Sequence, residues 1–409
     1  MVTKPRCVGV GRAYGELQRD KRSCRGKWSC GGESEESDGE DGDVRQNVAG
    51  LPRYGVTIAT ASQDGGSTIY VIKSTALESG VSQSVDREYE DFEWLHQSLH
   101  EQEGIAGLSG VVFPPLPPEA GTPITSAEAK MKKQLGELFT ADEKKRECRA
   151  LENYVLAVLS HPILGHNPAL RSFLIQRDLT PRTKTRKGIF SKFSLAMEEM
   201  RKENHKDNDP IFQQERQVNT TLINESKAAL EKLLELAVAE QRLALACGHL
   251  STTLLSTISE NDSYNEKLFC RTLIKLSDAM HVAKGGMEDL VASELWTLGL
   301  HLEHYVHHQE AEKEMLFRRT CRLIDVENAS RALDKAKPAK KPAAEEVKKE
   351  AEKALEEITA TARSEIDAYR SHRGAAGLDA LSSFAKAQAK VAKDVLGTFQ
   401  EELERFRKL

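Results

Sequence analysis

A long stripe of apolar residues in the C-terminal half constrains the fold of this chain more than any other feature. Beyond Pro210 the sequence contains prolines only at positions 338 and 342, so residues that break helices are rare there. Apolar residues recur at helical spacing over a stretch much longer than one globular helix: Leu230, Leu233, Leu234, Ala237, Val238, Leu273, Leu276, Met280, Met287, Leu290, Leu298, Leu302 and Tyr305. The pattern predicts long helices that pack in a bundle.

The last segment carries a similar stripe with its own period. Its apolar residues step by four, four and three, an eleven-residue repeat that keeps them on one face: Val347, Ala351, Leu355, Ile358, Ala362, Ile366 and Tyr369. We expect "KPAKKPAA" at 337–344 to separate the second helix from the third, and Gly285-Gly286 and "GAAG" at 374–377 to allow bends. Three long helices with wide apolar stripes need a second copy to cover them, so the prediction is an all-α, dimeric, curved rod.

Composition excludes several classes of protein. Charged residues make up 30% of the 409 residues, and the formal net charge is -5, which argues against a dedicated nucleic-acid binder because such proteins need a broad basic surface. The 7 cysteines are scattered, without CxxC pairs, as expected in a reducing compartment. No apolar run reaches the roughly 20 residues that cross a bilayer, so we expect any membrane contact to be peripheral.

The N-terminal half divides into a tail and a mixed domain. Residues 1–50 are rich in Gly and Ser and end in the acidic run "GGESEESDGEDGDV", which predicts a disordered tail. From 51 to 177 the pattern changes to short alternating strands, with "QDGGST" as a turn and a third strand in "VSQSVDREY". Helical patterns follow around the proline-rich "FPPLPP". The prediction is an α+β domain with a three-stranded antiparallel sheet.

Four motifs resemble one protein family. They are "REYEDFEWLH" at 87–96, "FPPLPP" at 113–118, "ENYVLAVLSHPIL" at 152–164 and "LFRRTCRLIDVENASRALDKAKP" at 316–338. Together they resemble the sorting nexins that join a phox-homology (PX) domain to a BAR domain, and most of all the branch of sorting nexins 5 and 6. The resemblance implies a PX domain at 51–177, a linker helix at 178–202 and a BAR domain at 203–409.

The resemblance also implies a phosphoinositide pocket, which this sequence has altered. In typical PX domains a basic residue just before the junction tyrosine, here Tyr89, holds the 3-phosphate, because a guanidinium matches a phosphate in geometry. Glu88 occupies that position, and Arg87 should face the opposite side of the strand. We expect the Tyr89 ring to pack between the strand and the helix that follows it. The degenerate pocket consists of residues at this junction and two further basic candidates: Arg87, Glu88, Tyr89, Arg146 and Arg149.

In the branch of sorting nexins 5 and 6, the resemblance implies that the PX domain binds protein cargo tails. The binding elements are a helical insertion after the proline loop and an exposed sheet edge. The segment 125–148 takes the place of the insertion and is shorter than in the family, and Leu138 and Phe139 are its apolar candidates for cargo binding. Capping the domain core is an equally open role for these two side chains.

The linker has the pattern of a helix that lies on an anionic membrane. Ile189, Phe193, Met197 and Met200 share one helical face, and seven basic residues in 182–202 stand against two acidic ones. The alternative is a linker helix packed on the bundle. The residues predicted to bind membrane in this segment are Lys184, Arg186, Lys187, Ile189, Phe190, Lys192 and Phe193.

Two basic clusters on the long helices extend this prediction. Arg318, Arg319 and Arg322 form the first, and Lys335, Lys337, Lys340 and Lys341 gather at the turn before the last helix. Each basic residue near an anionic surface contributes about 1 kcal/mol of attraction. A solvated face is the ordinary alternative for such runs.

The sequence offers no recognisable catalytic machinery. It contains no phosphate-binding glycine loop, no nucleophile elbow and no HExxH pattern. His301, His304 and His308 share a helical face, but no third ligand type is fixed by spacing, so we predict neither a metal site nor a cofactor.

These observations predict a non-enzymatic trafficking adaptor in the cytoplasm, peripheral on early endosome membranes. By family resemblance it would dimerise with another PX-BAR sorting nexin, act with retromer-like machinery and support tubule-based sorting and retrograde transport of cargo. Two alternatives remain: a phosphoinositide sensor in which Arg87 or Arg146 replaces the missing cation, and a soluble coiled-coil scaffold.

Overall fold

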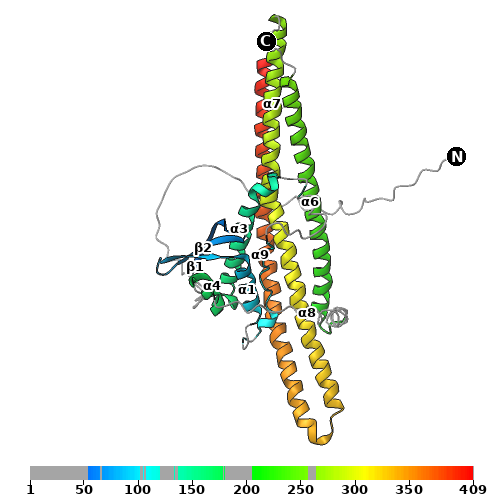
Figure 1. Ribbon diagram of the computed structural model, residues 1–409. Helices are drawn as coiled ribbons and strands as arrows, with labels where there is room; N and C mark the ends of the chain where they lie inside the picture. Colours follow the sequence, from blue (N-terminus) through cyan, green and yellow to red (C-terminus); the bar gives the residue numbers. More distant parts are fainter. Residues whose placement is uncertain are drawn as a thin grey trace, which may run out of the picture. The chain divides into compact units, whose positions relative to one another are not determined.

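The computed structural model describes residues 54–64, 67–101, 105, 107–119, 133, 137–177, 179, 205–256 and 264–408 (Figure 1). Gly50–Leu409 form one compact unit. The predicted acidic tail and, apart from Leu179, the predicted linker helix lie outside the described residues. All described strands and helices belong to this unit.

Three antiparallel strands form the sheet, as predicted. They are β1 (Tyr54–Asp64), β2 (Ser67–Ala76) and β3 (Ser82–Arg87), in the order β1-β2-β3. Ile58 pairs with Ile72, which in turn pairs with Val85. All three side chains are buried. Residues paired directly across neighbouring strands point to the same side of the sheet, and this side faces the core.

Helices cover this sheet and complete its core. They are α1 (Tyr89–His100), α3 (Glu137–Ser160) and α4 (Pro168–Ile175), and the rings of Tyr70, Phe92 and Phe173 meet edge to face between sheet and helices. Asn167 caps α4 by accepting the N–H of Ala169 at 2.7 Å, with proline at the first helical position, where its missing N–H costs nothing. We call residues 54–177 the sheet region.

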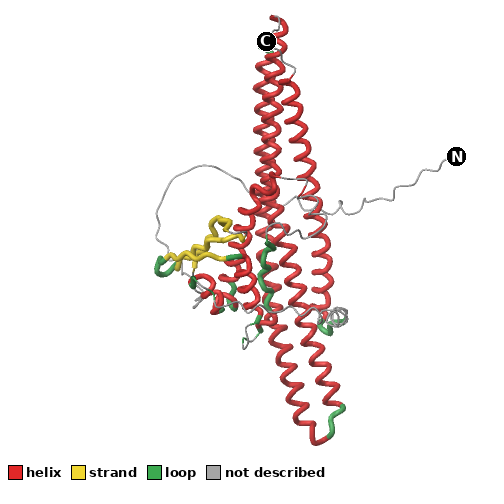
Figure 2. Tube along the Cα trace, viewed as in Figure 1, coloured by secondary structure: helices red, strands yellow, loops and turns green. Residues whose placement is uncertain are grey.

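The described residues of the C-terminal part are mostly helical, apart from short stretches such as 205–209 and 335–337 (Figure 2). It contains α6 (Pro210–Ser256), α7 (Tyr264–Glu294), α8 (Leu300–Asp334) and α9 (Lys341–Phe406), which we call the helical bundle. A short 3-10 turn at Pro338–Lys340 separates α8 from α9, as the prolines predict. The predicted bend sites at Gly285-Gly286 and 374–377 lie within α7 and α9, and a π-helical turn at Leu295–Gly299 follows α7.

Parts of the predicted apolar stripes form the bundle core. Leu230, Leu234 and Ala237 of α6 pack against Val291 and Leu295. In α9, the middle of the eleven-residue repeat is buried at Ile358, Ala362 and Ile366. Val347, at the start of the repeat, remains 58% exposed. A periodic stripe therefore marks a face, but neighbouring helices decide which part of the face is covered.

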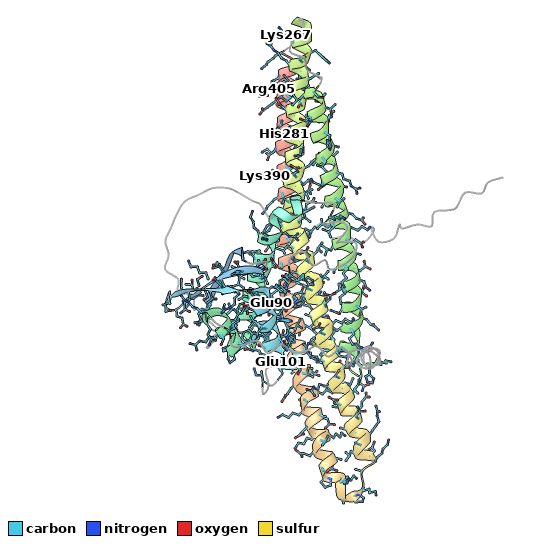
Figure 3. The ribbon with its side chains drawn as sticks, in the orientation of Figure 1. Glu90, Glu101, Lys267, His281, Lys390 and Arg405 are labelled. Carbon is cyan, nitrogen blue, oxygen red and sulfur yellow. The ribbon has the colours of Figure 1, made fainter. Side chains whose placement is uncertain are left out.

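The sheet region packs directly on the bundle. A 3-10 turn at Leu108–Gly110 lies against α9, and Val112 joins a cluster with Phe212, Met315, Leu316, Ala362 and Ile366. A Cβ atom at Gly110 would lie 2.6 Å from the carbonyl oxygen of Ile358, so only glycine allows this approach. Figure 3 shows charged side chains on the outside of both parts, such as Glu90 and Glu101 on α1 and Lys267 and Lys390 on the bundle.

Candidate functional site

Arg87, the last residue of β3, is a structural cation. Its side chain is 2% exposed, and its guanidinium donates to the carbonyl of Phe173 from Nε at 3.0 Å and from Nη2 at 2.6 Å. It also donates to the carbonyls of Asp86 and Gln176. Because carbonyls at the end of α4 carry partial negative charge, Arg87 neutralises that helix end. Its assignment to a lipid pocket is therefore corrected.

Glu88 begins α1. Glu88 and Asp91 form a capping box, in which the backbone N–H of Glu88 donates to the Asp91 carboxylate at 2.9 Å. A carboxylate at a helix N-terminus satisfies an orphan N–H and interacts favourably with the helix dipole. The residue that replaces the usual phosphate-binding cation therefore stabilises the start of the helix.

Tyr89 connects this junction to the proline loop and is surrounded by carboxylates. Its hydroxyl donates to the carbonyl of Pro117 at 2.7 Å. Burial, together with the charges of Glu93, Glu119 and Glu147, raises the pKa of Tyr89 to about 12. Burial and Glu147 also raise the pKa of the neighbouring Tyr70. Carboxylates therefore act on both hydroxyls, and their negative charge disfavours a bound phosphate.

The two other basic candidates are engaged with protein carboxylates. Arg146 is 8% exposed, and its Nη2 donates to Glu303 of α8 at 2.9 Å. Arg149 donates from Nη1 to Glu152 at 2.8 Å, whose other oxygen accepts the N–H of Ile58 at 3.0 Å. Arg146 thus joins the sheet region to the bundle.

Arg318 does not lie on a membrane-facing surface as predicted. It donates from Nε to the carbonyl of Ser109 at 2.9 Å and from Nη2 to that of Val111 at 2.6 Å. Its guanidinium carbon lies 5.1 Å from the ring centre of Phe113, within range of a cation–π interaction. Arg318 therefore fastens the beginning of the proline loop to α8.

Arg319 is also turned inward, so its predicted role in membrane binding is wrong. It is 4% exposed, forms an ion pair with Asp207 and lies 3.8 Å from the ring centre of Phe212. Its Nε donates to Thr359 of α9 at 3.1 Å. No local pattern indicates this role, because the partners of Arg319 lie far away along the chain.

The remaining basic candidates lie on the surface. Arg322 is exposed and contacts Asp325 at 3.4 Å. Lys335, Lys337, Lys340 and Lys341 are exposed around the turn between α8 and α9. The side chains of Leu138 and Phe139 and the linker candidates lie outside the described residues: Lys184, Arg186, Lys187, Ile189, Phe190, Lys192 and Phe193.

Comparisons with known proteins find similar sequences and a similar solved structure. The family model of the PX domain matches residues 76–177. Human sorting nexin-6 is 28% identical over 340 residues, which cover 78% of this chain and 82% of that protein. Mouse sorting nexin-32 is 27% identical over 342 residues, covering 76% and 81%. A solved structure, the SNX-BAR Mvp1 tetramer, aligns with a TM-score of 0.48 and 13% identity over 85% of this chain and 99% of that chain.

Residues 76–177 match a PX domain, and a long helical region follows them. The chain is related to sorting nexin-6 and sorting nexin-32, which confirms the resemblance to PX-BAR sorting nexins of that branch. This combination supports an adaptor in membrane trafficking. Among the described helices, none is both long enough and apolar enough to cross a bilayer.

Proposed function

We propose that this chain is a non-enzymatic adaptor of endosomal trafficking that dimerises through its long helices and associates with curved, anionic membrane. In this role it supports tubule-based cargo sorting and retrograde transport, together with a second PX-BAR sorting nexin. One observation carries the proposal: a PX domain with acidic rather than basic surroundings at its junction tyrosine is packed on a helical bundle with exposed apolar side chains.

The dimer surface is the end of the bundle formed by the second half of α6, the start of α7 and the last part of α9 (Figure 1). Leu243, Leu250, Phe269, Leu396 and Leu403 are between 46% and 63% exposed on these three helices. Large exposed apolar side chains gathered at one end of a bundle are typical of an interface between protein chains.

Membrane contact in this proposal belongs to the lysines around the turn between α8 and α9, together with the basic amphipathic linker. Lys335, Lys337, Lys340 and Lys341 are exposed, so they are available to anionic headgroups. The PX domain instead binds protein cargo, with Leu138 and Phe139 as apolar anchors. The phosphoinositide-sensor alternative is less well supported, because Arg87 and Arg146 are bound within the protein.

Vesicle flotation tests the proposal. The full chain is mixed with phosphatidylserine vesicles that carry single phosphoinositides, and is compared with Glu88→Arg and with Glu90→Arg, an exposed position in the same helical turn. We expect the natural chain to float without preference for one phosphoinositide, and only Glu88→Arg to gain one. Strong natural preference for one phosphoinositide would favour the sensor, and no flotation at all would favour a soluble scaffold.

A further inference from the structure

Two glutamates of the bundle meet without a cation between them. Glu294, the last residue of α7, is 1% exposed and hydrogen bonds with Glu240 of α6. Gln388 of α9 donates to Oε1 of Glu294, so the pair lies where α6, α7 and α9 meet. The Oε2 atom of each carboxyl group is buried and has no hydrogen-bond partner among the described residues.

The charged groups on the surrounding helices do not neutralise this pair. Lys284 and Glu288 of α7 form an ion pair at 3.1 Å, and Arg242 of α6 and Lys390 of α9 are exposed. His301 of α8 lies against α9 about three turns before Gln388. Among the described groups, only Glu240 acts on Glu294 through its charge.

Two buried carboxylates at hydrogen-bond distance cannot both ionise without a large cost in free energy. Ala237, one turn before Glu240, and Leu295, next to Glu294, belong to an apolar cluster, so little water is available to solvate the charges. Burial and the charge of Glu240 raise the pKa of Glu294 to about 8, and burial raises the pKa of Glu240. The two carboxyl groups therefore share one proton.

A second pair of carboxyl groups on α6 shows the contrast. Glu215 hydrogen bonds with Glu312 of α8, and Arg370 of α9 forms an ion pair with Glu215. Arg370 and Arg373 both act on Glu312 against the effect of burial. Ionisation leaves this second pair beside two cations.

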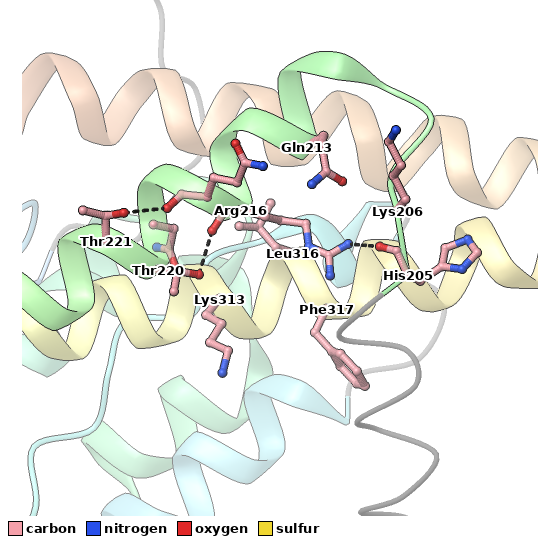
Figure 4. A pocket seen from close by; sticks show the side chains of 11 residues that line it. His205, Lys206, Gln213, Arg216, Thr220, Thr221, Lys313, Leu316 and Phe317 are labelled. Carbon is pink, nitrogen blue, oxygen red and sulfur yellow. Dashed lines mark hydrogen bonds between the residues drawn. The ribbon is translucent and has the colours of Figure 1, made fainter.

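Further contacts hold the N-terminal end of α6. Figure 4 shows Arg216 donating to the carbonyl of His205, at 2.7 Å from Nη1, and Thr220 donating to the carbonyl of Arg216 at 2.8 Å. These contacts require no carboxyl proton. The pair that only a proton can neutralise lies further along α6, in the half that carries the proposed dimer surface.

Glu240 is a neighbour of that surface. Leu236 and Leu243, four residues before it and three after it, are 44% and 52% exposed, and residues at these spacings lie side by side on a helix. Glu294 is enclosed, whereas Glu240 is only partly buried. When the shared proton leaves, Glu240 is therefore the side chain that can turn outward into water.

We propose that the proton shared by Glu240 and Glu294 controls dimer formation. With the proton, Glu240 stays turned into the bundle and the leucine surface remains apolar. Without it, Glu240 turns outward and adds a negative charge that a dimer would have to bury. The dimer therefore holds the proton more tightly than the monomer, so association weakens as pH rises. The inference rests on the proposed dimer surface and adds its regulation by pH.

Infrared spectroscopy tests the shared proton independently of the dimer. The spectrum of the natural chain minus that of Glu240→Gln/Glu294→Gln should contain the C=O absorption of a protonated carboxyl group at about pH 7, and this absorption should fade towards about pH 9. Glu231→Gln, at an exposed position of the same helix, should keep it. If the absorption is missing at about pH 7, the two carboxyl groups share no proton and the proposal is wrong.

Sedimentation equilibrium of the full chain at about pH 7 and about pH 9 tests the link to association. We expect the natural chain and Glu231→Gln to associate about tenfold more weakly at the higher pH, and Glu240→Gln to associate equally at both. An equal change in the natural chain and Glu240→Gln would contradict the proposal. A protonated pair in a chain that is monomeric at both pH values would overturn the regulation together with the dimer surface, whereas a dimer of constant strength would overturn the regulation alone.

Discussion

Two adjacent arginines of α8 show how different the roles of neighbouring side chains are. Arg318 binds backbone carbonyls of the sheet region, whereas Arg319 binds Asp207, which precedes α6. Neighbours on a helix point about 100° apart, so one residue secures the contact between the two parts and the next secures the bundle.

Arg318→Ala should destabilise the chain by about 2 kcal/mol, because the carbonyls of Ser109 and Val111 lose charge-assisted donors. Urea unfolding at neutral pH measures this. The matched control is Arg322→Ala, which removes an exposed arginine one turn later and should cost less than about 0.5 kcal/mol. Equal costs for both variants would show that the carbonyl contacts contribute no stability.

Replacing glycine by alanine should change the stability of the chain in opposite directions at Gly110 and Gly374. Gly110→Ala should destabilise by about 1–3 kcal/mol, since the new methyl group would lie 2.6 Å from a backbone oxygen of α9. Gly374→Ala has no atom within 4 Å of the new group, inside α9, and should stabilise by about 0.5–1 kcal/mol. Thermal unfolding of both variants measures these changes in stability. An unchanged stability of Gly110→Ala would rule out the close contact between Gly110 and the backbone of α9.

At the scale of elements, buried carboxylates join the helices of the bundle. Glu294 of α7 is 1% exposed, hydrogen bonds with Glu240 of α6 and accepts from Gln388 of α9. Burial and the nearby Glu240 raise the pKa of Glu294 to about 8. Burial and Glu215 likewise raise the pKa of Glu312 to about 7, against the opposing effect of Arg370 and Arg373. Two carboxylates at hydrogen-bond distance must share a proton.

These raised pKa values make the bundle less stable at higher pH. The folded chain holds protons that the unfolded chain releases above its ordinary pKa near 4.5, so stability falls as pH rises from there to about 8. Glu294→Gln keeps an acceptor for Gln388 and removes the charge. We expect it to be more stable than the natural chain by about 1–2 kcal/mol near pH 8, after allowance for screening, with no gain near pH 5.

Denaturant unfolding across this pH range measures the difference between the two chains. Histidines with lowered pKa values, such as His308 on α8, act in the opposite direction but contribute equally to both chains. Glu401→Gln, at a side chain that is 73% exposed, serves as the control and should follow the natural curve. A constant difference between Glu294→Gln and the natural chain at all pH values would contradict a shared proton.

At the scale of the whole molecule, the proposed dimer surface can be tested by self-association. The described residues hold two large apolar side chains of equal exposure at very different places, Phe269 on α7 and Leu77 after β2, each 63% exposed. Only the first lies on the proposed dimer surface, so the pair separates specific association from general stickiness.

Phe269→Glu should weaken self-association by about 2 kcal/mol or more, because it places a charge in the apolar surface. Leu77→Glu should leave association unchanged. Sedimentation equilibrium of the natural chain and both variants measures the constants. If the natural chain is monomeric at every concentration, the same comparison is made with a second PX-BAR sorting nexin as partner, and an unchanged Phe269→Glu would overturn the proposed surface.

The strands and helices of this protein follow from local features of its sequence. Strand alternation, the stripe from Leu230 onward, the proline break before α9 and the replacement of a cation by Glu88 all depend on residues close together in the chain, where local periodicity and composition govern conformation. The PX domain and the long helices could therefore be predicted before any coordinates.

The roles of the charged residues, in contrast, follow from tertiary packing. Arg318 meets residues 209 and 207 positions away, and Arg319 meets Asp207 at a separation of 112. Val112 enters a core made mostly by the bundle. A basic residue on a helix has the same local pattern whether it faces a membrane, a carbonyl or a carboxylate. The choice depends on which distant elements pack beside it, because burial makes an unpaired charge costly and so selects its partner.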